Sequence, residues 1–227
     1  MMDKLILQAH DLFKDTGFNY CICGGFALDL FAGKELRSHG DFDMAFYSDE
    51  KANIVGFVQE NGFTVYGRLE SGKIFYRVDD INDVKWFDCN NFWAVKPDSF
   101  AHMYPTGDKP GEYTYNIIEP RLQSFDFIEL AFNERSDDDF FLQYEPKIRM
   151  SLDKVTLYKD DVPYMAPEMV LMLKTHPESF NHPYLKPKAE TDFKAVMPLL
   201  SDESKKWLFD TLAMVYPNGY EWLDGLL

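Results

Sequence analysis

Two short stretches decide how this chain can fold: Cys23–Asp29, which reads Cys-Gly-Gly-Phe-Ala-Leu-Asp, and Asp41–Asp43, which reads Asp-Phe-Asp. The glycine pair removes side-chain bulk where a ligand must approach the backbone. The N-terminus of a helix beginning there favours an anion. A strand over the second stretch would place its two carboxylates on one face, since residues i and i+2 of a strand point the same way. The two stretches therefore predict a phosphate-binding turn beside a carboxylate pair that can hold a divalent metal ion.

Hydrophobic periodicity around these stretches predicts a mixed α/β unit. Helices are expected over about 3–16, 26–32 and 50–60, and Gly33 is expected to end the second of them. The expected strands are 18–23, 41–47, 63–68, 73–78, 84–92 and 125–132. Residues 97–112 contain several Pro and Gly and are expected to form a long loop.

The character of the chain becomes helical from about residue 160. Pro167 suits the first turn of a helix, and further helices are expected over 190–200, 202–215 and a short segment ending at Leu227. We therefore expect an α+β fold. A mixed sheet with flanking helices would occupy residues 1–150, and a helical region, residues 151–227, would pack on it.

Composition and charge limit the possible partners. The formal net charge is −15, and long-range attraction to nucleic acid would need the opposite sign. An acidic field would instead attract a cationic small molecule or metal ions. The three cysteines suggest no disulfide framework, and no apolar run is long enough to span a membrane. We expect a cytoplasmic protein without nucleic-acid or membrane partners.

A carboxylate from a neighbouring strand would complete the metal site. Magnesium prefers oxygen ligands and keeps some of its waters, so two or three carboxylates can hold it on substrate phosphates. Glu129 is the first candidate for this third position, and Asp88 and Asp126 are the alternatives. Asp126 and Glu129 face opposite sides of a regular strand and cannot both serve. The third carboxylate is also a candidate acceptor for the proton of an attacking group.

Three polar residues near the two stretches have two interpretations each. Arg37 and His39 lie in the loop that enters the acidic strand, where they could contact triphosphate oxygens or make local loop hydrogen bonds. Asp29 could contact a substrate or stabilise the helix that contains it. The sequence leaves these alternatives open.

Together these residues resemble a known signature. Gly24–Asp29, Gly33, Arg37, His39 and Asp41–Asp43 closely resemble the pattern G-G-W-A-x-D…G…R-x-H-x-D-x-D. That pattern is typical of the aminoglycoside 2″-adenylyltransferase and lincosamide nucleotidyltransferase branch of the polymerase-beta-like nucleotidyltransferase superfamily. Within the motif only Phe26 departs, where Trp is usual.

The resemblance continues along nearly the whole chain. Three further segments are similar to patterns of related proteins. Glu129–Glu134 is similar to E-x-M-L-N-E, and Tyr164–Lys174 is similar to Y-L-A-P-E…L-L-Y-K. Pro187–Phe193 is similar to R-P-K-D-x-x-D-F. Two further departures remove charges. Gln143 and Tyr144 replace an Arg-Arg pair, and Ala189 replaces the Asp that follows the Lys at position 188.

The resemblance implies a nucleotidyltransferase fold and a magnesium-dependent enzyme that moves a nucleoside monophosphate, AMP from ATP, to a small hydroxylated acceptor. The acceptor would be aminoglycoside- or lincosamide-like, and a cationic one would suit the acidic chain. Asp41, Asp43 and Glu129 would be catalytic and metal-binding, although antibiotic-modifying members place their third carboxylate in a segment more like the one containing Asp88. The residues implied to bind the donor are Gly24, Gly25, Arg37, His39 and Lys188.

Two other functions stay open. One is AMP transfer to a partner protein, as in a toxin–antitoxin pair. The other is nucleotide binding without catalysis, because the missing cations at positions 143 and 144 would weaken any triphosphate contact that they make in relatives.

Overall fold

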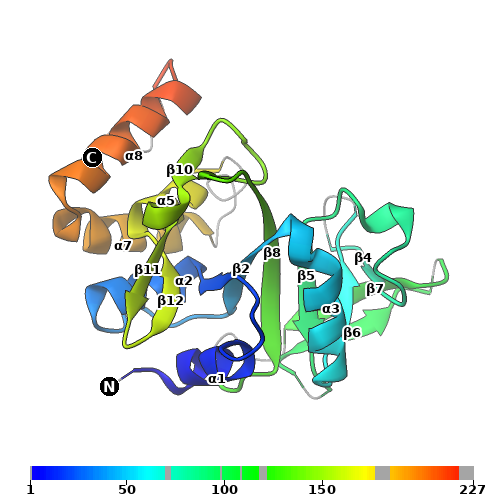
Figure 1. The fold of residues 1–227 in the computed structure, drawn as a ribbon. Coiled ribbons are helices and arrows are strands. Elements are labelled where there is room, and N and C mark those ends of the chain that lie inside the picture. The colour runs from blue at the N-terminus through cyan, green and yellow to red at the C-terminus, as the bar shows by residue number, and fades with distance from the viewer. Residues whose placement is uncertain are drawn as a thin grey trace.

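The computed structural model describes residues 2–69, 73–97, 99–107, 109–117, 122–176 and 185–219, and these form a mixed sheet flanked by helices (Figure 1). The strands follow the order β11-β12-β1-β2-β8-β5-β3-β4-β7-β6, and β9 and β10 continue from β8 as a ribbon. Their bounds are β1 (Tyr20–Ile22), β2 (Asp43–Tyr47), β3 (Thr64–Gly67), β4 (Phe75–Arg77), β5 (Asn91–Val95), β6 (Ala101–Pro105), β7 (Glu112–Ile117), β8 (Phe127–Arg135), β9 (Asp139–Phe141), β10 (Arg149–Ser151), β11 (Thr156–Lys159) and β12 (Val162–Met165). The expected α+β class is confirmed.

The centre of the sheet is the parallel pair β2 and β8. Asp43 is in register with Glu129, and Phe46 with Phe132. Alternation along the two strands places Phe46 and Phe132 in the core, with their ring centroids 5.8 Å apart. The same alternation turns Asp43 and Glu129 to the opposite face. The parallel pairing thus brings the two carboxylates to neighbouring positions from sites 86 residues apart in the chain.

Helices cover both halves of the sheet. They are α1 (Lys4–Phe13), α2 (Gly24–Ala32), α3 (Lys51–Glu60), the short α4 (Leu152–Val155), α5 (Pro167–Leu173), α7 (Leu185–Val196) and α8 (Asp202–Val215). In Figure 1, α5, α7 and α8 gather on the side of β12 and α2, while α3 lies on the half that contains β3, β4 and β5. Contacts join α5 to α8, α2 and α7. None of the helices in the described ranges has the length and apolarity that crossing a bilayer demands.

Several predicted elements differ from the structure. Residues 84–86 form a 3₁₀ turn rather than a strand, because the Asp83 side chain accepts from the Lys85 backbone N–H and caps it, and β5 begins only at Asn91. The expected loop 97–112 contains β6, which pairs with β7. The expected helix that ends at Leu227 lies outside the described residues.

The helical character begins later than expected. After the single turn of α4, the hairpin of β11 and β12 joins the main sheet through parallel pairing of Ile22 with Tyr164. The run of C-terminal helices therefore starts at Pro167, in the predicted first turn of α5. The predicted division of the chain at residue 150 stays a prediction.

Candidate functional site

The glycine pair opens α2 directly beside the predicted carboxylates. Gly24 has a φ of +60°, and a Cβ at this position would lie 1.8 Å from Asp43 Oδ2. A Cβ on Gly25 would lie 2.3 Å from His39 Nδ1. Only glycine allows both the left-handed backbone and this close approach. The pair therefore seats Asp43 and His39 against the N-terminus of α2, whose unpaired N–H groups favour negative charge.

Asp41, Asp43 and Glu129 lie in neighbouring segments on this side of the sheet. Asp43 begins β2, Asp41 lies two residues before it, and Glu129 is the strand partner of Asp43 on β8. Asn91 on β5 donates from Nδ2 to Glu129 Oε1 at 2.6 Å. Among the described residues, no three His, Cys, Asp or Glu side chains stand close enough together to form a metal-binding group. Their predicted metal and catalytic roles stay predictions.

Crowding of like charges perturbs these carboxyl groups. Burial raises the pKa of Asp43 well above its usual value, and the charges of Asp41 and Glu129 raise it further. Burial also raises the pKa of Glu129, partly offset by the hydrogen bond from Asn91. A nearby cation favours the charged form of a carboxyl group. A bound divalent ion would therefore relieve this repulsion.

The two alternative carboxylates lie elsewhere. Asp126 accepts from Ser99 Oγ at 3.1 Å and from Ser124 Oγ, which secures the entry to β8. Asp88 is exposed and follows the 3₁₀ turn at residues 84–86. Neither side chain lines a cavity with Asp41 or Asp43.

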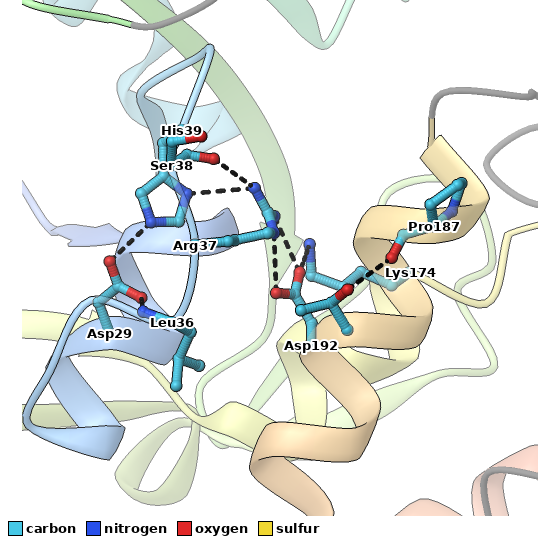
Figure 2. Close-up of polar contacts among 9 residues, drawn as sticks. Asp29, Leu36, Arg37, Ser38, His39, Lys174, Pro187 and Asp192 are labelled. Atoms are coloured by element: carbon cyan, nitrogen blue, oxygen red, sulfur yellow. Dashed lines mark hydrogen bonds and ion pairs between the residues drawn. The ribbon is translucent and has the colours of Figure 1, made fainter.

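His39 is held in a chain of buried polar contacts (Figure 2). Its Nε2 lies 2.6 Å from Asp29 Oδ2, and its Nδ1 lies 3.3 Å from Arg37 Nη1. A guanidinium can only donate, so Nδ1 accepts and Nε2 carries the hydrogen that is donated to Asp29. The other Asp29 oxygen accepts from the Leu36 backbone N–H at 2.9 Å. Of the two interpretations of Asp29, these contacts favour the structural one.

Arg37 continues this chain to the C-terminal helices. Its Nε and Nη2 donate to the two carboxylate oxygens of Asp192 on α7, at 2.9 and 2.8 Å. Lys174, which follows the last residue of α5, pairs with Asp192 Oδ2 at 2.9 Å. Asp192 is only 1% exposed. Figure 2 shows Asp192 between the two cations.

Two cavities meet at Asp43 and Lys174, which line both. The smaller has a volume of about 80 Å³ and is enclosed mainly by charged side chains. Its lining is Gly25, Arg37, Asp41, Asp43, Lys174, Leu185, Lys188 and Ala189. Three cations thus surround a space of phosphate size beside the predicted metal ligands. Lys188 is among these cations, and its predicted role in donor binding stays a prediction.

The larger of the two has a volume of about 310 Å³. Small residues of the sheet, including Ala45 and Ala131, form its floor. Apolar side chains of α5 and neighbouring segments also line the cavity, together with several side-chain amides. The remaining lining residues are Cys23, Gly24, Asp43, Asn91, Glu129, Asn133, Leu142, Gln143, Tyr144, Met165, Val170, Leu173 and Lys174. Its volume is at the lower end of the range for small-molecule sites.

A further cavity of about 380 Å³ lies near the other ends of β1 and β2 and is lined by residues such as Tyr20, Tyr47 and Arg135. The only carboxylate among its lining residues is Asp161. It therefore lacks the carboxylate pair that identifies the first two cavities as the candidate site.

The N-terminal part of the chain is similar to known proteins. Residues 5–89, which include the glycine pair, Arg37, His39 and both aspartates, match the family model of the aminoglycoside-2″-adenylyltransferases. Over these residues the chain is similar to that family. A lincosamide resistance protein of Staphylococcus haemolyticus is 22% identical over 107 residues, which are 45% of this chain and 66% of the relative's length.

One solved structure has a similar fold over most of the chain. A crystal structure of the lincosamide antibiotic adenylyltransferase LnuA with lincomycin bound aligns with a TM-score of 0.52 and 14% identity. The alignment covers 87% of this chain and 98% of LnuA. The structure of ANT(2″)-Ia in complex with adenylyl-2″-tobramycin aligns with a TM-score of 0.48 and 13% identity, and the alignment covers 92% of this chain and 94% of ANT(2″)-Ia. The likeness to LnuA supports a common nucleotidyltransferase fold.

The oxygen ligands at the site suit magnesium. Carboxylate oxygens are the ligands that magnesium prefers, and it is usually held by one or two carboxylates together with substrate phosphates. Asp41 and Asp43, which share the small cavity, meet this need.

The sequence does not predict some residues of this candidate site. Lys174, Asp192, Asn91 and Asn133 were not predicted as site residues, because their distance from Asp43 along the chain hides their proximity in space. Lys174 and Asp192 do lie in the two C-terminal segments that resemble relatives, and that signal could have found them. The departures at Gln143 and Tyr144 line the larger cavity, and the Tyr144 hydroxyl donates to the Met172 carbonyl at 3.4 Å.

Proposed function

We propose that this protein is a magnesium-dependent nucleotidyltransferase that transfers AMP from ATP to a hydroxyl group of a small molecule. The observation that carries the proposal is the position of Asp43 between two unlike cavities. One cavity is lined by three cations, and the other by apolar and amide side chains. Transfer between a phosphate donor and an organic acceptor needs such a junction, with the reacting groups in line.

The donor's phosphate groups would occupy the smaller cavity. Arg37, Lys174 and Lys188 provide positive charge for the phosphate oxygens. A volume of about 80 Å³ accommodates phosphate groups but not a nucleoside, so the nucleoside would lie beyond the cavity. Magnesium held by Asp41 and Asp43 would neutralise charge on the phosphates and on the leaving pyrophosphate.

The transfer step follows from this placement. The acceptor oxygen attacks the α-phosphorus of ATP, a new P–O bond forms, and the bond to the bridging oxygen of pyrophosphate breaks with its electron pair. The acceptor's hydroxyl proton leaves to a carboxylate. Glu129 is suited to receive it, because Glu129 lines the larger cavity and its raised pKa makes it a better base than an exposed carboxylate.

The acceptor would be a small hydroxylated molecule with an apolar part. Apolar walls at Leu142, Val170 and Leu173 favour a hydrocarbon surface, and Asn91, Asn133 and Gln143 offer hydrogen bonds. Asp43 and Glu129 suit an acceptor with a positive charge near the reacting hydroxyl. Both lincosamide-like and aminoglycoside-like compounds carry hydroxyl and amino groups and belong in the test panel.

The test is transfer of label from ATP labelled at its α-phosphate, with Mg²⁺, to a panel of lincosamides, aminoglycosides and other amino sugars. We expect one acceptor class to become labelled, and the Asp41→Ala, Asp43→Ala double variant to be inactive. Activity that survives in this variant contradicts the proposal. Label on a partner protein instead would favour protein AMP transfer. If the chain shows no magnesium-dependent binding of ATP, the alternative of a non-enzymatic module is favoured over both enzymes.

A further inference from the structure

Asp192 joins three parts of the molecule at the small cavity. Its carboxylate receives two parallel hydrogen bonds from Arg37, in the loop after α2, and an ion pair from Lys174, at the end of α5. Asp192 itself belongs to α7. The side chains of Arg37 and Lys174 are 15% and 17% exposed, so both cations remain accessible at the cavity wall.

The contacts of Arg37 leave it able to bind a further group. A guanidinium has five N–H donors. Two of them reach Asp192, one reaches the Ser38 carbonyl, and one reaches His39 Nδ1. The remaining donor is on Nη2, the atom that lies 3.2 Å from the position of a Cβ on Gly25. This donor therefore lies at the cavity and at the N-terminus of α2.

Asp192 also decides which carboxylates the two cations neutralise. Lys174 and Arg37 both lower the pKa of Asp43 through their charges, yet their ion pairs are made with Asp192. Without Asp192, Asp41 and Asp43 would be the nearby anions left at the cavity for them to pair with. Such pairing would occupy the oxygens that a metal ion needs. Two cations around one anion also leave a net positive charge for phosphate.

We propose that Asp192 is a positioning residue, whose carboxylate holds Arg37 and Lys174 at the small cavity in the orientation that receives the donor's phosphate groups. The inference rests on the proposed function, because it assigns the small cavity to the donor. It gives α7 a second part in donor binding, because Lys188 of the same helix also lines the cavity. Asp192 itself touches no substrate.

The test compares binding of two probes, ATP with Mg²⁺ and inorganic triphosphate with Mg²⁺, by calorimetry on the full chain. We expect Asp192→Asn to weaken both by about tenfold, the effect of losing one charge-assisted contact. In turnover, the KM for ATP should rise by about the same factor while the KM for the acceptor stays unchanged. Glu203→Gln is the control, because it removes one acidic partner of an exposed ion pair, with Lys154, far from the cavity lining.

The outcomes separate this inference from the proposed function. If the unchanged chain binds neither probe, both are overturned. If Asp192→Asn binds both probes as tightly as the unchanged chain while its melting temperature falls, Asp192 only joins α7 to α5 and to the loop after α2. In that case this inference alone is overturned.

A second measurement covers the case in which Asp192→Asn does not fold. Nitrogen NMR of arginine side chains in the unchanged chain, assigned with Arg37→Lys, should show Nη2 of Arg37 shifting on addition of either probe while Nε keeps its hydrogen-bonded position. Loss of the Nε hydrogen bond on binding, or an unchanged Nη2 signal, would contradict the inference.

Discussion

At the scale of single residues, Gly24 is the position with the least tolerance. Alanine there would have a φ of +60° and a Cβ 1.8 Å from Asp43 Oδ2. The backbone strain costs about 1 kcal/mol, and the collision displaces Asp43 from the junction of the cavities. We expect Gly24→Ala to reduce kcat/KM by about a hundredfold or more, since misplacement by about 1 Å costs that much.

Gly17 offers a matched control for this prediction. It has a φ of +79°, and a Cβ at this position would meet nothing within 4 Å, so Gly17→Ala introduces similar backbone strain without a collision. We expect a similar loss of stability in urea unfolding and unchanged activity. Equal activity losses in both variants would show that strain alone, and not the position of Asp43, is responsible.

Glu129 is tested against the carboxylates that compete with it in the sequence. We expect Glu129→Gln to lower kcat by about a hundredfold, the lower end of general base contributions, with a smaller change in KM for ATP. Asp88→Asn should remain within about twofold of the unchanged chain, because Asp88 is exposed and lines neither cavity. Steady-state kinetics of the two variants decides which residue is the third carboxylate.

At the scale of secondary-structure elements, the attachment of α7 should depend on pH. Burial would raise the pKa of Asp192, but Lys174 and Arg37 outweigh it and hold the pKa below its usual value. A lowered pKa stabilises the fold above the pKa of an unfolded Asp, about 3.9, and this contribution is lost as pH falls through the folded value. Asp192→Asn removes it, and breaking a buried pair costs about 3 kcal/mol near neutral pH.

Urea unfolding of the unchanged chain and of Asp192→Asn at a series of pH values measures this effect. The difference in unfolding free energy should be constant from neutral pH to about pH 4 and should shrink at lower pH. A difference that stays the same throughout the acid range would show that protonation of Asp192 does not weaken the ion pairs.

The shared face of β2 and β8 makes a separate prediction about the acceptor. Ala131 lies in the floor of the larger cavity, on the same side of β8 as Glu129. Valine suits a strand, so Ala131→Val should change the cavity without disturbing β8. We expect it to raise the KM for the acceptor by about tenfold, in line with the cost of about 1–3 kcal/mol for overpacking. The KM for ATP should stay unchanged. Thr156→Ile is the control, because Thr156 lines the separate cavity of about 380 Å³. This substitution should change neither KM.

Much of the element order was predictable because local patterns determine it. α1, α2, α3, α5 and α8 follow apolar periodicity and clear end signals, such as Pro167 and Ser201. β6 was missed because its strand character comes from pairing with β7, and the predicted strand over 84–92 failed at the cap of Asp83 on Lys85. Long-range pairing leaves little trace in a local window.

The residues of the candidate site also fall into those that local sequence predicts and those that only tertiary packing brings together. Asp41 and Asp43 lie in one short segment, and the glycine pair marks their position from the sequence alone. The neighbourhood of Glu129 depends on strand register, and Lys174 and Asp192 depend on how α5 and α7 pack against α2. Those contacts are set by tertiary packing. The sequence and its resemblance therefore named the predicted metal ligands and two cations of the small cavity, Arg37 and Lys188, but not Lys174 or Asp192.

At the scale of the whole molecule, the net charge of −15 should influence which acceptors arrive quickly. An acidic field raises the local concentration of cations, and salt screens it because the Debye length falls from about 10 Å at 0.1 M to about 3 Å at 1 M. We therefore expect kcat/KM for a cationic acceptor to fall as salt rises. A neutral hydroxylated acceptor should show a weaker dependence.

The ratio of the two acceptor values isolates this field, because both reactions use the same donor and the donor's own salt dependence cancels. The ratio of kcat/KM for the cationic acceptor to that for the neutral one should fall by several-fold over this range of salt. A constant ratio would mean that the acidic surface does not guide acceptors. Any preference for a cation would then come from Asp43 and Glu129, whose short-range interactions in a partly buried cavity are screened much less.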